Sequence, residues 1–269
     1  MGRKPEGEKV MHLGLDTGMT KSARYALLPG DPYRSETLAR KLAEGADAEE
    51  LAWKREYCSW LAEVEGVPVL VCSTGIGGPS ASIAIDELAQ LGVTSFIRVG
   101  TTGAIQLHIP VGDVIITSGS VRLDGASTHY APIEFPAVAH YEVMAALVAG
   151  AKQVLPGRFH VGVTVSCDTF YPGQERKDSF SGYVPRRFQN ITEEWKRLHC
   201  LNYEMESATV LTLCAALGLR AGSVAGVVVN REQGEEFTAL EEGEDNSVKL
   251  AVAGLRELVR RDRAGSRDG

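Results

Sequence analysis

The chain has 269 residues, of which 44% are apolar and 23% are charged, and its formal net charge is −7. These values are typical of a globular protein near the upper size limit for one hydrophobic core. Because nucleic acids and anionic membranes attract basic surfaces, the acidic balance argues against either of them as the main partner.

Charged residues, together with glycine and proline, open the chain and predict a flexible N-terminal arm at residues 1–10. A single domain is expected to follow at residues 11–259. Its first strand is predicted at residues 25–28, where the side chains are apolar, and Pro29-Gly30-Asp31-Pro32 ends that strand.

A helix is predicted directly after this turn, because Asp31 can cap it and Pro32 suits its first position. A junction of strand, glycine turn and helix leaves backbone N–H groups free for an anion, and Arg34 in the first turn adds further donors. On this motif alone, a plain turn with a surface arginine is the stronger interpretation.

A buried arginine marks the next part of the chain. An apolar strand at residues 67–72 leads into a glycine-rich turn at residues 73–80 and a helix, and a third strand at residues 94–99 carries Arg98. A buried guanidinium keeps its charge and therefore needs an anionic partner. An internal ion pair would satisfy it, but the N–H and hydroxyl donors of Gly100-Thr101-Thr102-Gly103 favour a bound phosphate.

Further apolar strands are predicted at residues 114–117 and 161–166, with a helix at residues 141–151 between them. The second of these strands opens on the loop Thr169-Phe170-Tyr171-Pro172-Gly173-Gln174-Glu175-Arg176. Aromatic rings can stack, glutamine donates and accepts, and arginine only donates, so this loop suits a flat heterocycle with several carbonyls. A surface loop with packed aromatic rings explains the segment equally well.

Two carboxylates, Glu204 and Glu206, precede an uncharged run at residues 208–217 that ends at Gly218. This run predicts a buried helix with a glycine cap. If the segment before the helix is extended, both carboxylates share one face and suit a ribose diol; if it is helical, they diverge. Alternatively, the acidic residues only favour the positive end of the helix.

The last predicted strand lies at residues 221–229 and ends in Asn230-Arg231. A glutamate-rich segment at residues 232–245 is expected to form a mobile flap or a solvated run of charges. Ser247 is predicted to cap a final amphipathic helix through Leu258, followed by a flexible tail at residues 260–269.

Apolar strands that alternate with helices predict an α/β fold with a mainly parallel, buried sheet. Ligands bind such sheets at the carboxyl ends of the strands. The glycine turns, Arg98, the loop after Ser166 and Arg231 all follow strands, so we expect them to converge where Glu204 and Glu206 emerge.

The five cysteines are odd in number and widely spaced, without a metal-ligand spacing, which predicts reduced thiols in the core. No basic-then-apolar leader opens the sequence, and no apolar run is long enough to span a bilayer. We therefore expect a cytoplasmic protein.

Five motifs taken together closely resemble the nucleoside phosphorylase I family, in particular its uridine-cleaving members. They are Pro29-Gly30-Asp31-Pro32, Ser73-Thr74-Gly75-Ile76-Gly77-Gly78-Pro79-Ser80, Arg98-Val99-Gly100-Thr101-Thr102-Gly103, Phe170-Tyr171-Pro172-Gly173-Gln174-Glu175-Arg176 and Asn202-Tyr203-Glu204-Met205-Glu206-Ser207. No single motif is specific, but their shared order is, and the resemblance extends from about Met11 to Leu258. Cys167 departs from the pattern, which has a small hydroxyl residue there.

The resemblance implies a three-layer αβα sandwich with a mixed, mainly parallel central sheet, assembled as a hexamer, a trimer of dimers that share their sites. It implies reversible phosphorolysis of uridine to uracil and ribose 1-phosphate, in pyrimidine salvage and nucleoside catabolism. Thymidine and 2′-deoxyuridine are further candidate substrates. Phosphate is a co-substrate, and no cofactor is required.

The resemblance also implies residue roles. The phosphate residues would be Gly30, Arg34, Arg98 and Thr101, with Arg55 from a neighbouring subunit. The ribose residues would be Thr101, Glu204, Met205 and Glu206, with His12 from that neighbour. The base residues would be Phe170, Gln174, Arg176, Val228 and Arg231. The catalytic residues would be Arg98, Arg176 and Glu206. Some relatives hold a monovalent cation between subunits, and Glu56, Ile76 and Ser80 match that position, which makes K⁺ a candidate.

Three alternatives accompany this hypothesis. Purine nucleoside phosphorylases carry a Ser-Asp pair after the last strand, where this chain has Asn230-Arg231. A nucleosidase that uses water would leave the phosphate arginines without an anion. A non-catalytic nucleoside-binding protein would not require all of these residues, and every one of them is present.

Overall fold

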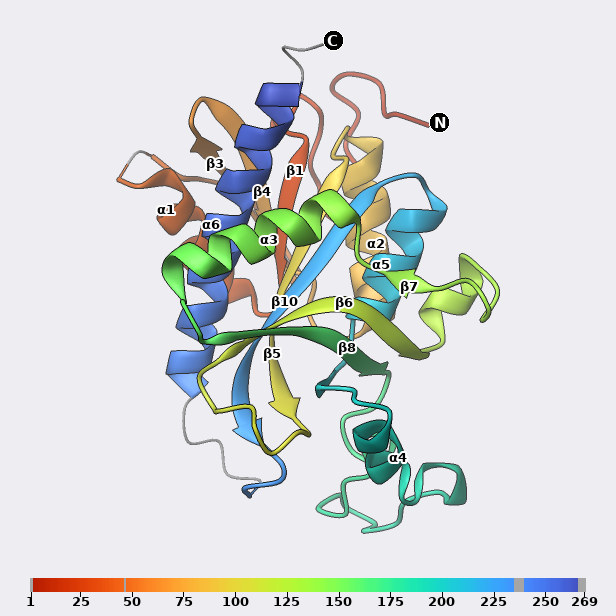
Figure 1. Cartoon of the computed structure of the whole chain (residues 1–269). Helices are drawn as coiled ribbons and strands as arrows, with labels where there is room; N and C mark the ends of the chain where they lie inside the picture. The colour runs from red at the N-terminus through yellow and green to blue at the C-terminus, as the bar shows by residue number, and fades with distance from the viewer. Residues whose placement is uncertain (1, 46, 235–239, 266–269) are drawn as a thin grey trace.

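A computed structural model of the chain describes residues 2–45, 47–234 and 240–265. Helices and strands follow one another around a large sheet (Figure 1). The strands are β1 (Tyr25–Pro29), β2 (Glu49–Lys54), β3 (Tyr57–Val64), β4 (Val67–Cys72), β5 (Ser95–Ala104), β6 (Val114–Leu123), β7 (Ala137–Val138), β8 (Phe159–Cys167), β9 (Asn202–Glu204) and β10 (Arg220–Asn230). The helices are α1 (Pro32–Ala43), α2 (Gly78–Gln90), α3 (Tyr141–Val154), α4 (Ile191–Arg197), α5 (Ser207–Ala216) and α6 (Leu240–Gly265). Short 3₁₀ turns are η1 (Ala126–His129), η2 (Pro172–Gln174) and η3 (Arg186–Phe188).

The sheet is mixed, as predicted. Its order is β10-β6-β8-β9-β5-β1-β4-β3-β2, with β7 on β6 and β10 also paired to β5. Parallel pairings do not predominate, because the described strands form five parallel and five antiparallel pairings. The β10–β5 pairing closes a ring of five strands, β5, β10, β6, β8 and β9.

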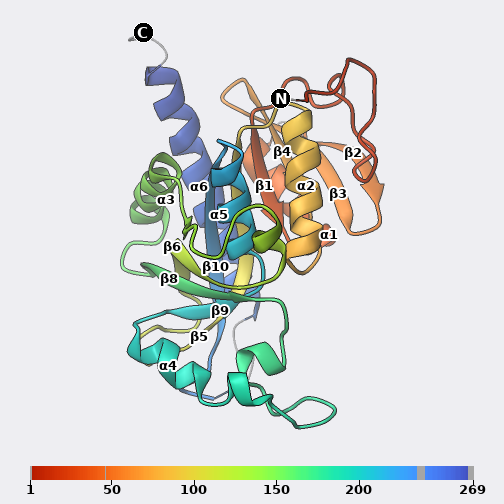
Figure 2. The ribbon, with the colours of Figure 1, turned by 90° about the vertical axis from the view of Figure 1, so that its right-hand side faces the viewer.

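Two groups of helices bury two separate cores. Leu38 of α1, Val143 of α3 and Leu258 of α6 belong to one core, whereas α2 and α5 contribute to the other. Neighbouring residues of β5 divide between them, because Ile97 packs in the first core and Phe96 in the second. Figure 2 shows α5 beside α2 and away from α3.

Helix α5 is the buried helix that the sequence predicts. Residues 207–214 are all buried, and Gly218 has the left-handed φ of 70° expected after the last turn. The predicted cap of α1 is also confirmed, since the carboxylate of Asp31 accepts a hydrogen bond from the Tyr33 amide at 3.0 Å.

The final helix differs from its prediction at both ends. α6 begins at Leu240, and the hydroxyl of Ser247 donates to the carbonyl of Glu244 at 2.7 Å inside the helix instead of capping it. α6 continues past Leu258 to Gly265. The predicted flap therefore includes the helical residues 240–245, while residues 235–239 of the flap and residues 266–269 of the predicted tail lie outside the described residues.

The early start of α6 depends on a close approach between two glycines. A Cβ at Gly226 of β10 would lie 1.8 Å from the carbonyl oxygen of Gly243 in α6. Only glycine allows the helix to pack this closely on the strand. Gly243 lies in the glutamate-rich segment at residues 232–245 that was predicted to be a loop.

Replacing Gly226 with alanine is expected to lower the free energy of unfolding by about 1 to 3 kcal/mol, because the new methyl group meets backbone atoms that cannot rotate away. Denaturant unfolding of the variant measures this. Gly265→Ala is the matched control, since a Cβ there has nothing within 4 Å. An unchanged unfolding midpoint for Gly226→Ala would contradict this packing of α6 on β10.

All five cysteines are buried and free, as the sequence predicts. Burial raises the pKa of Cys167 to about 12, so its thiol is protonated at neutral pH. Among the described helices, none combines the length and hydropathy needed to cross a bilayer.

Candidate active site

Most of the predicted site residues line one cleft of about 730 Å³. The predicted residues in its lining are Gly30, Arg34, Ile76, Arg98, Thr101, Phe170, Gln174, Arg176, Glu204, Met205, Glu206 and Val228. The lining also contains Gly100, Thr102 and Gly103 of the predicted phosphate-donor segment, together with Asp31, Pro32, Gly75, Tyr203 and Val229, for which no role in binding was predicted. The cleft thus forms at the carboxyl ends of β1, β5 and β10, as the predicted topology requires.

The glycine turn after β1 lies against the arginine of β5. A Cβ at Gly30 would stand 3.1 Å from Nη2 of Arg98 and 3.3 Å from the carbonyl oxygen of Gly75, so a side chain at this position would crowd both. Asp31 caps α1 and thereby places Arg34 in the first turn, on the cleft. Burial lowers the pKa of Arg34, and an ion pair with Glu244 opposes that shift.

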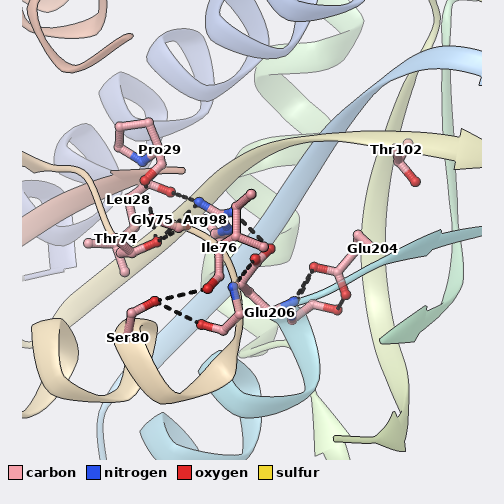
Figure 3. Close-up of polar contacts among 12 residues, drawn as sticks. Leu28, Pro29, Thr74, Gly75, Ile76, Ser80, Arg98, Thr102, Glu204 and Glu206 are labelled. Atoms are coloured by element: carbon pink, nitrogen blue, oxygen red, sulfur yellow. Dashed lines mark hydrogen bonds and ion pairs between the residues drawn. The ribbon is translucent and has the colours of Figure 1, made fainter. Parts of the chain in front are cut away.

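Arg98 forms a buried ion pair with Glu206 (Figure 3). Its Nη2 lies 2.8 Å from Oε2 of Glu206, and both side chains are 6% exposed. Nη1 of Arg98 donates to the carbonyl of Leu28 at 3.0 Å, while Oε1 of Glu206 accepts from the amide of Gly77 at 2.6 Å. Glu206 is therefore the partner of Arg98 in this structure. The sequence had favoured a bound phosphate over such an internal ion pair.

Glu204 and Glu206 do not form a matched pair. Strand β9 ends at Glu204, so the two-residue period does not continue to Glu206. Oε2 of Glu204 accepts from the amides of Glu206 and Ser207 at 2.9 and 2.8 Å, and Oε1 accepts from the Ser207 hydroxyl at 2.5 Å. Glu204 therefore accepts hydrogen bonds at the first turn of α5, which fits the alternative interpretation that an acidic residue favours the positive end of the helix. Glu206 is directed toward Arg98 instead (Figure 3).

Burial raises the pKa of Glu204, and the neighbouring charge of Glu206 raises it further. The three hydrogen bonds that Glu204 accepts act in the opposite direction, since they stabilise its ionised form. Glu204 therefore supports the backbone on which Met205 and Glu206 reach the cleft.

The loop after β8 supplies an aromatic, amide and guanidinium group to the cleft. Gln174 and Arg176 are each 4% exposed, and the guanidinium of Arg176 lies 4.3 Å from the ring centroid of Phe170. Arg231, predicted to contact the base, is not in the cleft lining; its Nη1 donates to the carbonyl of Gln174 at 2.8 Å. A register shift in β10 between Val227 and Val229 accompanies the entry of Val228 into the lining.

Glu175, between Gln174 and Arg176, was given no role by the sequence, but its carboxylate anchors this loop. Its backbone adopts a left-handed φ of 56°. Its carboxylate accepts from the amides of Asn190 and Thr192 at 2.5 and 3.0 Å, next to α4. These two hydrogen bonds hold Gln174 and Arg176 at the cleft. In the sequence, the position of Glu175 between two polar residues of the loop was the one feature that could have pointed to this role.

His12 and Arg55, predicted to act from a neighbouring subunit, lie outside the cleft lining. Nδ1 of His12 is 2.6 Å from the carboxylate of Glu87, and Arg55 is exposed in the turn between β2 and β3. The residues next to them in the chain are in contact: Nζ of Lys54 donates to the carbonyl of Met11 at 2.6 Å. His12 and Arg55 therefore belong to one region of the surface, as a shared role requires.

The predicted cation residues are also near one another. The hydroxyl of Ser80 donates to the carbonyls of Ile76 and Gly77 at 3.3 and 3.1 Å. The Glu56 side chain packs at Gly75, within 3.1 Å of the position of a Cβ. Within residues 2–45, 47–234 and 240–265, no cluster of three or more histidine, cysteine or acidic side chains could hold a metal ion.

Known proteins are similar to this chain along most of its length. A profile of the Phosphorylase superfamily matches residues 24–260. The chain is 55% identical over 252 residues to the uridine phosphorylase of Escherichia coli (strain K12), covering 93% of this chain and 98% of that protein. It is 42% identical over 266 residues to the uridine phosphorylase of Thermococcus kodakarensis, covering 99% of this chain and 93% of that protein. It is 38% identical over 252 residues to the guanosine phosphorylase of Halorubrum lacusprofundi, covering 94% of this chain and 95% of that protein. A profile match across most of the chain, together with these identities, shows that the chain belongs to the phosphorylase superfamily.

Proposed function

We propose that this chain is a uridine phosphorylase, a pentosyltransferase that reversibly converts uridine and phosphate into uracil and ribose 1-phosphate. The observation that carries the proposal is the cleft, which gathers two arginines, a buried carboxylate and the Gln174/Arg176 pair. Identities of 52% to 55% to uridine phosphorylases of Haemophilus influenzae and Escherichia coli support it.

The charges of the cleft suit this reaction. Breaking the N-glycosidic bond leaves positive charge on the sugar and negative charge on the departing base. Glu206 would stabilise the sugar cation, and Arg176 with Gln174 would stabilise the uracil anion, which places fixed charge where charge develops. No covalent enzyme intermediate and no redox cofactor are needed.

Phosphate would occupy the region of the glycine turn, Arg34 and Arg98. The proposed phosphate ligands are Gly30, Arg34, Arg98 and Thr101, with Arg55 from a neighbouring subunit. Nε of Arg98 is buried and has no hydrogen-bond partner among the described residues, so a donor remains for a bound anion. The ribose would contact Thr101, Glu204, Met205 and Glu206, with His12 from the neighbour, and Glu204 would also hold the α5 end of the site.

The finer architecture is part of the same proposal. We propose a single domain at residues 11–259, a three-layer αβα sandwich, because the two helix groups bury separate cores. A hexamer built as a trimer of dimers would bring His12 and Arg55 to a neighbouring cleft. K⁺ at Glu56, Ile76 and Ser80, a cytoplasmic location and a role in pyrimidine salvage complete the proposal.

Guanosine phosphorolysis is the second candidate, because the guanosine phosphorylase of Halorubrum lacusprofundi is 38% identical. Protonation of a purine nitrogen needs an acid near the base. The side-chain amide of Asn230 cannot supply it and is engaged elsewhere, since Nδ2 donates to the carbonyls of Gln106 and Ile109 at 3.0 and 2.7 Å. Uridine therefore suits the described cleft better.

The test is uracil release from uridine by the purified protein, with and without phosphate, beside thymidine, inosine and guanosine. Phosphate-dependent release from uridine, and not from the purine nucleosides, is the expected result. Phosphate-independent release would mean a nucleosidase. Uridine binding without turnover would mean a non-catalytic nucleoside-binding protein.

A further inference from the structure

An acidic residue of α6 contacts one of the proposed phosphate ligands. The carboxylate of Glu244 forms an ion pair with Nη2 of Arg34, whose side chain is only 12% exposed, whereas that of Glu244 is 35% exposed. Arg34 lines the cleft together with Arg98 and Thr101. Glu244 belongs neither to the cleft lining nor to any of the five motifs.

A phosphate dianion and this carboxylate require the same guanidinium. Burial and the nearby charge of Arg98 both disfavour the charged form of Arg34, and Glu244 offsets them. When phosphate binds Arg34, Glu244 becomes a nearby like charge, and the two repel each other over a few ångströms. A phosphate bound here would therefore be held more weakly than Arg34, Arg98 and Thr101 alone would allow.

We propose that Glu244 is an internal competitor of phosphate for Arg34, and that it thereby sets the phosphate affinity of the site. This inference rests on the proposed function. It assigns a role in substrate affinity to the first turns of α6, a part of the molecule that makes no contact with ribose or base in the proposed arrangement.

The next residue along the chain is a matched control. Asp245 forms ion pairs with Lys41 and, at 2.7 Å, with Lys249, and none with Arg34 is found among the described residues. Asp245→Asn and Glu244→Gln each remove one negative charge from the same helical turn. Only Glu244→Gln releases Arg34, so the comparison separates competition at Arg34 from a general change in charge.

Glu244→Gln is expected to lower the phosphate KM and the phosphate Kd by about two- to fivefold, the range of a partly exposed ion pair. The uridine KM should change less than about twofold, because Glu244 is not in the cleft lining and its ion pair is with Arg34, a proposed phosphate ligand. Steady-state kinetics at saturating uridine and calorimetry with inorganic phosphate alone give the two readouts. Asp245→Asn should leave both phosphate values unchanged, and Glu244→Asp, which keeps the charge, should stay closer to the parent protein than Glu244→Gln does.

An unchanged or higher phosphate Kd in Glu244→Gln, with the parent protein still cleaving uridine with phosphate, would overturn the inference and leave the proposed function intact. An equal gain in affinity for Asp245→Asn would also overturn it, because the effect would then be general charge. If the parent protein neither binds inorganic phosphate nor depends on it, both the proposed function and the inference fail.

Discussion

Replacing Arg98 with alanine is expected to raise the phosphate KM by about 10- to 100-fold and to lower the free energy of unfolding by about 3 to 5 kcal/mol. The first effect follows from the loss of charge-assisted hydrogen bonds to the anion. The second follows because Glu206, whose side chain is 6% exposed, would lose the cation 2.8 Å away and remain buried. Phosphate titrations in the uracil-release assay and denaturant unfolding measure the two effects separately.

A double variant separates these contributions. Arg98→Ala combined with Glu206→Gln removes both charges, so most of the lost stability should return, since the unpaired carboxylate causes the loss. Phosphate use should not return, because the guanidinium is still missing. A single Arg98→Ala variant with normal stability would contradict the buried ion pair, and one with a normal phosphate KM would exclude Arg98 from the phosphate site.

Arg176→Ala is expected to lower kcat for uridine by about 100- to 1,000-fold, the usual loss when one donor to a developing anion is removed. The phosphate KM should change little, because Arg176 belongs to the loop that carries Gln174 and Phe170. The cause can be checked with 5-fluorouridine, whose base is a more stable anion. The departing 5-fluorouracil anion needs less stabilisation than the uracil anion, so kcat for 5-fluorouridine should fall less in Arg176→Ala than kcat for uridine does.

Arg187→Ala is the control for this prediction. Arg187 is exposed and lies over the ring of Phe188, outside the cleft lining, and its removal takes the same charge from a nearby part of the chain. Its kinetics should match those of the parent protein. Equal losses for uridine and 5-fluorouridine in Arg176→Ala would assign Arg176 to binding and not to departure of the base.

Strands with a continuous apolar run, such as β1 and β4, could be predicted from the sequence, whereas β2, β3 and α4 could not, although β3 is an inner and mostly buried strand. β1 and β4 are buried on both faces and so appear as continuous apolar runs. β2, at the edge of the sheet, has exposed residues at both ends and only partly buried ones between. The sequence of β2 therefore lacks both the apolar run and the clear alternation that identify a strand. Helix α4 has one buried residue, so its sequence lacks a periodic apolar face.

The candidate site was predictable as a set of residues but not as a set of contacts. Arg98 was recognisable because a charge inside an apolar strand needs a partner. The identity of that partner could not be predicted, because Glu206 lies 108 residues further along the chain. The different roles of Glu204 and Glu206 depend on where β9 ends, and element boundaries are the least certain part of any pattern.

The closed ring of strands also determines when the cleft can form. β10 joins β5 across the sequence, and the guanidinium of Arg220 donates to the hydroxyl of Ser95, 125 residues away. Contacts this distant form late in folding, because the chain entropy lost in closing the loop precedes any gain from the contact. A nascent chain whose synthesis stops before β10 keeps an open edge on β5, and such an edge is a template for aggregation. The segment from β10 onward thus completes both the cleft and the protection of the sheet.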